Sequence, residues 1–175
     1  MNFDWVDLTV NLSVLIPLLL ALLGYYKERR DNRNDERLRK RKLLQALKME
    51  IDLNLKGLVE SNGNFPNAEA FNAVISSSRD YRPLIMLHYT ADIYRANTQQ
   101  LSDLETKLAG EIISFYQTLN FVKDLSKATD AIAYVTISDE SRKAVPERIR
   151  KELGAAIATG KNVSAELEQV ISRYI

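Results

Sequence analysis

Cysteine is absent from the 175-residue sequence, and histidine and tryptophan each occur once, at His88 and Trp5. Without cysteine the chain has no disulfide framework, no thiolate zinc site and no cysteine nucleophile. A single histidine also excludes the paired imidazoles on which many zinc sites are built. We therefore expect neither a metal nor a cofactor.

Glycine-rich loops and catalytic elbows are missing as well. The six glycines are scattered and form no dinucleotide-binding or P-loop pattern. Ser76, Ser77 and Ser78 do not stand in a GxSxG elbow, so we expect them to end a helix and form a loop. His88 is interpreted as a partly buried, hydrogen-bonded side chain, with a catalytic base as the alternative. We predict no enzymatic activity and no catalytic residue.

One long uncharged run stands near the start of the chain, from Leu8 to Tyr26, and contains nineteen residues. At ~1.5 Å of rise per residue, a helix of this length covers the ~30 Å hydrocarbon core of a bilayer. Trp5 and the Tyr25–Tyr26 pair stand where aromatic belts meet the two membrane surfaces. Residues 1–26 are therefore predicted to be an N-terminal tail and a transmembrane helix. A buried helix of a soluble protein is the alternative.

Basic residues follow this run and do not precede it. Residues 27–42 hold nine basic and four acidic side chains, whereas no Lys or Arg comes before Leu8. By the positive-inside rule, the chain is predicted to cross the cell (inner) membrane once, with the N-terminus outside and the C-terminal domain cytoplasmic. A signal peptide has the opposite charge order. Contact with anionic lipid is expected from part of this basic segment, at Lys27, Arg29, Arg30 and Arg33.

Small residues share one face of the predicted membrane helix, at Ser13, Pro17, Ala21 and Gly24. Small side chains let helix backbones approach closely in lipid. Pro17 also leaves the Ser13 carbonyl without its helical donor, and a neighbouring helix can supply one. These residues predict a homo-oligomer interface, with a monomeric, mildly kinked anchor as the alternative.

The remainder of the chain, residues 43–175, is predicted to be a helical domain that begins with an amphipathic helix. Apolar residues three and four apart define its buried face, at Leu44, Leu47, Ile51, Leu55 and Leu58. Asn62, Gly63 and Pro66 indicate a turn, and Asn67 is a plausible N-cap for a short second helix. The domain carries 15 basic and 17 acidic groups, and this near-neutral balance argues against binding duplex nucleic acid.

Three further helices are predicted beyond this point. The run from Leu84 to Tyr94 is interpreted as a helix, with a buried strand as the alternative. Ser102 and Glu105 have capping-box spacing and predict the start of a long helix, whose apolar stripe comprises Leu108, Ile112, Phe115, Leu119 and Val122. Pro146 suits the first turn of the last helix. Gly160 lies on the apolar stripe of that helix and indicates either a close helix crossing or a hinge. The predicted fold is all-α, with one N-terminal transmembrane helix and a cytosolic bundle of about four helices.

Arginine and tyrosine gather in one stretch of the domain, between Ser78 and Asn97. Guanidinium groups form forked hydrogen bonds with phosphate, and aromatic rings stack on bases, so this composition is one that a nucleotide pocket uses. The candidate ligand-binding residues are Arg79, Tyr81, Arg82, His88, Tyr89, Tyr94 and Arg95. The alternative is that the tyrosines belong to the core and the arginines cover them.

The functional expectation follows from this layout. The sequence predicts a membrane-anchored, non-enzymatic interaction or signalling module, whose expected partners are the lipid bilayer, further copies of itself and a protein. The layout resembles that of some membrane effectors of antiviral nucleotide signalling. That resemblance implies the alternative function of a membrane effector gated by a small anionic nucleotide, and it assigns no site residues.

Overall fold

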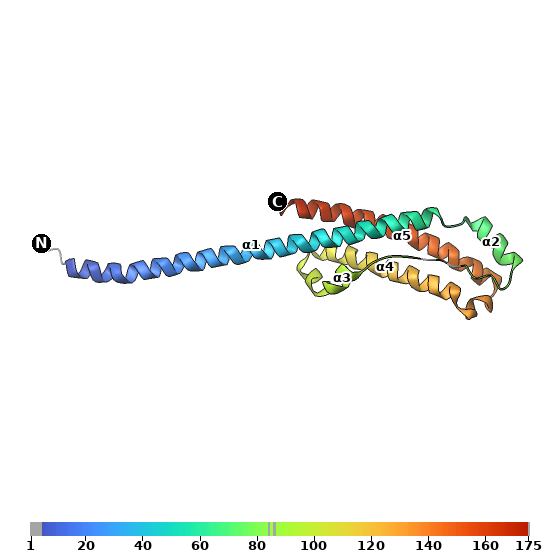
Figure 1. Ribbon diagram of the computed structural model, residues 1–175, viewed down its shortest axis with the longest axis horizontal. Coiled ribbons are helices and arrows are strands. Elements are labelled where there is room, and N and C mark those ends of the chain that lie inside the picture. Colours follow the sequence, from blue (N-terminus) through green and yellow to red (C-terminus); the bar gives the residue numbers. More distant parts are fainter. Residues whose placement is uncertain (1–4, 84, 86, 175) are drawn as a thin grey trace. The chain divides into compact units, whose positions relative to one another are not determined.

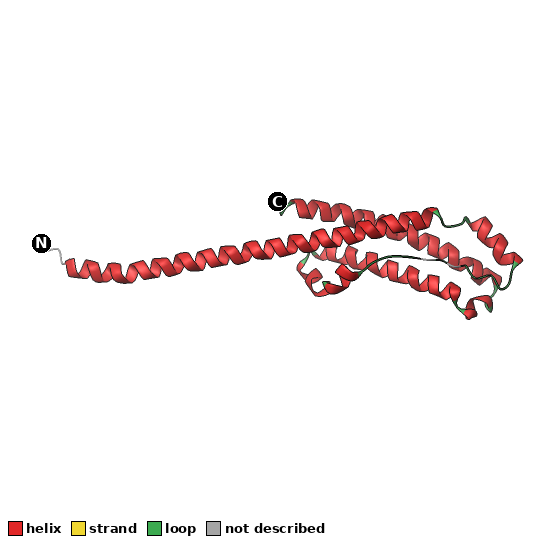
Figure 2. Cartoon of the chain, in the orientation of Figure 1, coloured by secondary structure: helices red, strands yellow, loops and turns green. Residues whose placement is uncertain are grey.

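The computed structural model describes residues 5–83, 85 and 87–174, with side chains described from Pro17 onward. These residues form helices and irregular connections, and no strand occurs among them (Figure 1, Figure 2). The elements in chain order are α1 (Trp5–Gly63), α2 (Ala68–Ser77), α3 (Asp92–Ala96), the 3-10 helix η1 (Thr98–Asp103), α4 (Thr106–Asp130), the 3-10 helix η2 (Ile132–Val135) and α5 (Asp139–Ser172). The predicted all-helical class is confirmed.

The chain divides into two compact units at a point inside α1. Residues up to 42 belong to the first unit and residues 43–173 to the second. In the first unit, every side chain from Pro17 to Arg39 is exposed. The second unit contains the hydrophobic core.

The core of the second unit is built from the C-terminal part of α1 together with α4 and α5, and α2 packs on α5. Leu44, Leu47, Ile51 and Leu58 on α1 are fully buried, and Leu55 is half-buried. The five stripe residues predicted for α4 are all buried as well. The helical bundle predicted from apolar spacing is therefore confirmed.

The predicted transmembrane helix is wrong. Among the described residues, none of the helices combines the length and the apolar character needed to cross a membrane. The described apolar side chains of the predicted span run from Pro17 to Tyr26, which at ~1.5 Å per residue is about 15 Å, half of a hydrocarbon core. The side chains of residues 8–16, on which the rest of the prediction depended, lie outside the described part.

The predicted localisation is corrected by the same finding. A single-pass placement in the cell membrane, with an outer N-terminus and a cytoplasmic C-terminal domain, required a spanning helix that the described chain does not contain. The basic residues 27–42 are instead part of α1, which continues through them without a break.

The last helix begins seven residues before Pro146. Ser138 is the N-cap of α5, and its side chain accepts a hydrogen bond from the Ser141 N–H at 3.2 Å. Pro146 therefore lies inside the helix, where it has no N–H to donate to the Arg142 carbonyl. Tyr134 supplies the missing donor, because its hydroxyl donates to that carbonyl at 2.7 Å. A side chain from η2 thus compensates for the proline.

Two predicted local structures do not form. The run from Leu84 to Tyr94 is irregular up to Ala91, with residues 84 and 86 outside the described part, and α3 begins only at Asp92. The Ser102–Glu105 capping box is also absent, because η1 occupies this stretch and Ser102 donates to the Gln99 carbonyl at 2.7 Å. Leu101 of η1 is buried, and α4 begins only after η1 has ended.

Gly160 lies where α1, α4 and α5 cross. A Cβ atom at this position would stand 2.7 Å from Leu55 Cδ2 and 2.7 Å from Phe115 Cε2. Helix α5 continues through Gly160 without interruption. The interpretation as a close helix crossing is therefore confirmed, and the hinge alternative is not supported.

This crossing predicts opposite effects for two alanine substitutions in α5. Gly160→Ala should lower the free energy of unfolding by about 1–3 kcal/mol, because the added methyl group overpacks the crossing. Gly154→Ala is the matched control, since nothing lies within 4 Å of its added Cβ. This change should raise stability by about 0.5–1 kcal/mol through helix propensity alone. Urea unfolding followed by circular dichroism measures both, and equal effects would contradict the close crossing.

Candidate functional site

The most distinctive region of the second unit is the linking segment, residues 78–91, which connects α2 to α3. Its described residues run beside α4 and have neither helix nor strand structure (Figure 1). Backbone polar groups in irregular structure need other partners when they are removed from water. Side chains from α1, α4 and α5 supply those partners here.

Two polar side chains on α1 hold the C-terminal end of the linking segment. Asn54, only 2% exposed, donates to the Thr90 carbonyl at 2.7 Å and accepts from the Thr90 N–H at 2.8 Å. Glu50, 6% exposed, accepts from the N–H groups of Ile93 and Tyr94 at 2.7 and 3.1 Å. These are orphan amides of the first turn of α3, whose own N-cap residue makes no side-chain bond. Glu50, a residue of α1, thus caps the N-terminus of a different helix, α3.

The Glu50 carboxylate has a third donor inside the core. The Tyr116 hydroxyl of α4 donates to it at 2.5 Å, and the Tyr116 ring stacks on Tyr94 with centroids 4.1 Å apart. Burial raises the pKa of the Tyr116 hydroxyl, and the hydrogen bond and charge of Glu50 add to that effect. The charge of Glu50 is therefore compensated by three directed hydrogen bonds.

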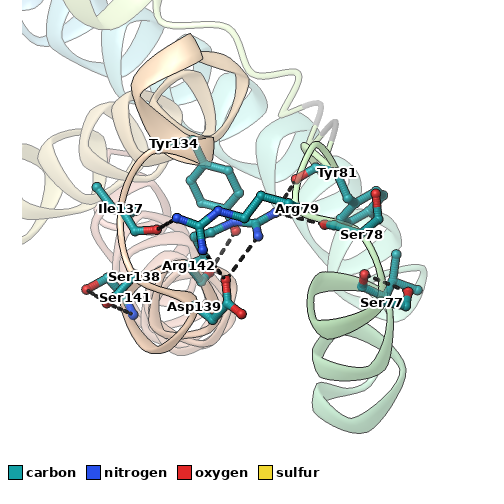
Figure 3. Close-up of polar contacts among 11 residues, drawn as sticks. Ser77, Ser78, Arg79, Tyr81, Tyr134, Ile137, Ser138, Asp139, Ser141 and Arg142 are labelled. Atoms are coloured by element: carbon teal, nitrogen blue, oxygen red, sulfur yellow. Dashed lines mark hydrogen bonds and ion pairs between the residues drawn. The ribbon is translucent and has the colours of Figure 1, made fainter.

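A buried arginine holds the N-terminal end of the linking segment (Figure 3). Arg142 on α5 is fully buried and donates to the carbonyls of Tyr81 and Ser78 at 2.7 and 3.3 Å. Its guanidinium carbon lies 5.4 Å from the centroid of the Tyr134 ring. The aromatic face contributes a cation–π attraction in a place where water is excluded.

Asp139 links this buried arginine to an exposed one. Its Oδ1 atom accepts from both Arg142 and Arg79 at 3.3 Å, and Arg79 also donates to the Ile137 carbonyl at 3.3 Å (Figure 3). Figure 3 shows both guanidinium groups directed at this one carboxylate. A group within the chain therefore already occupies the geometry that an external anion would need here.

The predicted ligand-binding residues are spread along α4, from its C-terminal end to its middle. Arg82 is exposed and donates to the Asp130 carbonyl at 3.1 Å, at the C-terminal end of the helix. Tyr94 stacks on Tyr116, fourteen residues earlier in the same helix. That difference is about 21 Å along a helix axis at ~1.5 Å per residue. The structure does not bring the arginines and tyrosines of this cluster into a single pocket.

The other members of the cluster lie along the linking segment. Tyr89 donates to Asn120 Oδ1 at 2.6 Å, and burial raises its pKa while the charge of nearby Arg95 opposes that shift. Tyr81 is half-buried and meets the ring of Phe71 edge to face at 6.5 Å. His88, predicted to be partly buried, is exposed and makes no side-chain hydrogen bond within the described part of the chain.

Two cavities flank the linking segment. The first, of about 710 Å³, is called the cationic cavity and is lined by Leu53, Lys56, Glu60, His88, Tyr89 and Lys123, among others. The second, of about 380 Å³, is called the aromatic cavity and is lined by Phe65, Phe71, Tyr81, Pro83, Val122 and Leu153, among others. Both fall within the 300–1,000 Å³ range of small-molecule sites. Leu87 and His88 line both.

The residues assigned to assembly and to lipid lie in the first unit. Pro17, Ala21 and Gly24 are exposed, and the side chain of Ser13 lies outside the described part. Lys27, Arg29, Arg30 and Arg33 are exposed too. Their assignment to lipid rested on a spanning helix, so it loses its structural basis. The predicted homo-oligomer interface was likewise argued for a helix in lipid, and it stays a prediction.

The residues that organise this region were missed by the sequence analysis. Glu50 and Asn54 fall on the same helical face as Leu47 and Ile51, where an apolar residue was expected. A polar residue on an apolar stripe is the signal that points to such a buried cap. Arg142 had no comparable signal, because its helix was predicted to start four residues later.

Comparison with known proteins gives no relative for this fold or for these cavities. No family model, curated protein or solved structure matches the chain. Among the described residues, no three side chains of the metal-binding types are grouped so that they could hold an ion. Function is therefore argued from the geometry alone.

The buried cap supplied by Glu50 predicts a local and a global effect. Glu50→Ala should lower the free energy of unfolding by at least about 2 kcal/mol, because two amides and the Tyr116 hydroxyl lose a charged acceptor. Hydrogen exchange at Ile93 and Tyr94 should accelerate together with it. Glu60→Ala, on the same helix at an exposed position, is the control and should change stability by less than about 0.5 kcal/mol. Unchanged protection at Ile93 would refute the capping role.

The raised pKa of Tyr116 predicts a loss of stability in alkali. In the unfolded chain the hydroxyl ionises at about pH 10, whereas in the folded protein it keeps its proton to higher pH. The free energy of unfolding should therefore be unaffected by this group below pH ~10 and should decrease above it. Tyr116→Phe should flatten the decrease between about pH 9.5 and 11.5. Urea midpoints measured across this pH range provide the test.

Proposed function

We propose that the protein is a helical interaction module without enzymatic activity, which assembles with further copies of itself through the apolar part of α1. One observation carries the proposal. Seven large apolar side chains between 46% and 64% exposed stand on consecutive turns of this helix, at Leu18, Leu19, Leu20, Leu22, Leu23, Tyr25 and Tyr26. A contiguous exposed apolar surface of this kind marks an interaction site.

The distribution of these residues around the helix favours a bundle over a pair. At ~100° per residue, the leucines and tyrosines cover roughly 220° of the circumference, and Pro17, Ala21 and Gly24 occupy the rest. A two-stranded coiled coil buries only a narrow stripe on each helix. Several neighbours are needed to cover a sector this wide, and the small residues allow one of them to approach closely.

Charge works against this assembly. The basic segment 27–42 has a surplus of five positive charges per copy, and within the described part of this segment only Lys40 and Glu36 form an ion pair, at 3.7 Å. Like charges brought together by parallel helices repel, and salt screens that repulsion with a Debye length of about 10 Å at 0.1 M. Assembly is therefore expected to strengthen as the salt concentration rises.

The test is the mass of the full-length protein in solution. The wild-type chain should have at least three times the mass of a single copy, and the fraction assembled should increase between 50 and 500 mM NaCl. Leu19→Lys combined with Leu23→Lys should give single copies, because both charges enter the apolar sector. Met49→Lys is the control on the same helix, at a 73% exposed position in the second unit. A monomeric wild-type protein at every salt concentration would refute the proposal.

Cysteine chemistry adds a positional test, since the chain has no native cysteine. Oxidation of Ala21→Cys should produce covalently linked copies, because Ala21 lies in the proposed interface. Asn34→Cys, placed in the basic segment of the same helix, should form far fewer. Equal cross-linking at the two positions would show that the apolar sector does not direct assembly.

A further inference from the structure

The cationic and aromatic cavities lie next to each other on the linking segment and differ in chemistry. The aromatic cavity reaches the hydrophobic core, because the buried core residues Val122 and Leu153 contribute to its lining. Phe65 and Phe71 stack at 5.5 Å between ring centroids on its wall. Such a wall favours a hydrocarbon or aromatic group.

The cationic cavity offers two ammonium groups. Lys56 extends from α1 and Lys123 from α4, and Glu60 is the one acidic residue among the lining side chains. Lys123 Nζ lies 5.3 Å from the centroid of the Tyr89 ring, which is itself fixed by the hydrogen bond to Asn120. Cation–π attraction therefore holds this ammonium at the cavity.

These two lysines differ from others in the same unit. Lys48 pairs with Asp52 and Glu168 at 2.8 and 3.0 Å, and Lys107 pairs with Glu111 and Glu166 at 3.6 and 3.4 Å. Within the described part of the chain, neither Lys56 nor Lys123 has a carboxylate within 4.0 Å. Their charge is thus available to a ligand.

We propose that the two cavities together bind a small amphipathic monoanion, a carboxylate with a hydrocarbon chain. The carboxylate lies between Lys56 and Lys123, and the chain passes Leu87 and His88 into the aromatic cavity. The balance of charge supports one negative group, because Glu60 offsets one of the two lysines. The Glu60 carboxylate would repel a polyphosphate, and a polyphosphate has no apolar group to fill the aromatic cavity. The proposal is independent of assembly through α1.

Calorimetric titration of the full-length protein with decanoate, below its aggregation concentration, tests this site. Decanoate should bind saturably with about one molecule per chain. Lys56→Gln combined with Lys123→Gln should weaken it at least tenfold and leave the weaker binding of decanol unchanged. Lys127→Gln, one turn from Lys123 on α4 and exposed, is the control and should bind like wild type.

A second variant locates the hydrocarbon chain. Ser61→Phe places a ring in the aromatic cavity from the last turns of α1, and it should abolish the saturable binding of both decanoate and decanol. The same titrations in the Leu19→Lys, Leu23→Lys background exclude binding to the exposed apolar segment. Decanoate binding that survives Ser61→Phe, that ignores the loss of both lysines, or that is undetectable in wild type overturns the proposal.

Discussion

The hydrogen bonds that side chains of α1 and α5 make to the backbone of residues 78–94 set the organisation of the folded unit. A segment with neither helical nor sheet bonding must satisfy its amides and carbonyls in some other way before it can lie against a core. Asn54 forms hydrogen bonds with both the N–H and the carbonyl of Thr90, and Arg142 donates hydrogen bonds to two carbonyls at the other end of the segment. Glu50 then starts α3 by supplying the cap that the local sequence lacks.

This arrangement explains why the region contains cavities. A helix laid along α4 would fill the space beside it with side chains on every turn, whereas an irregular segment presents fewer of them and leaves room next to it. The segment is held at its two ends, near Tyr81 and Thr90, and both cavities lie between or beside these attachments. The groups available for binding are therefore set by the helices as much as by the segment.

The N-terminal part of α1 follows a different principle. Its leucines are exposed and have no partner among the described side chains of the first unit. In the proposed assembly, the basic residues that follow would limit how closely the copies approach. In the folded unit, by contrast, the same helix buries its apolar face against α4 and α5 and places its lysines in ion pairs or beside a cavity.

The sequence by itself determined the helices whose apolar residues repeat at helical spacing. The stripes of α1 and α4 and the Asn67 cap of α2 formed as predicted, because both features depend on contacts a few residues apart. Gly160 was recognisable for the same reason, since a glycine on an apolar stripe indicates a close crossing. The predicted membrane span is contradicted, because no helix among the described residues combines the length and the apolar character needed to cross a membrane.

Only the tertiary structure decided the conformation of residues 78–91 and the position of the cavities. The apolar run from Leu84 to Tyr94 has no stable period of its own, so its backbone follows the donors and acceptors that distant residues offer. Asn54 lies 36 positions from its partner Thr90 in this run, and Arg142 lies 61 positions from its partner Tyr81, just before the run. No local pattern encodes such pairings, because they exist only after the helices have packed and water has been excluded from between them.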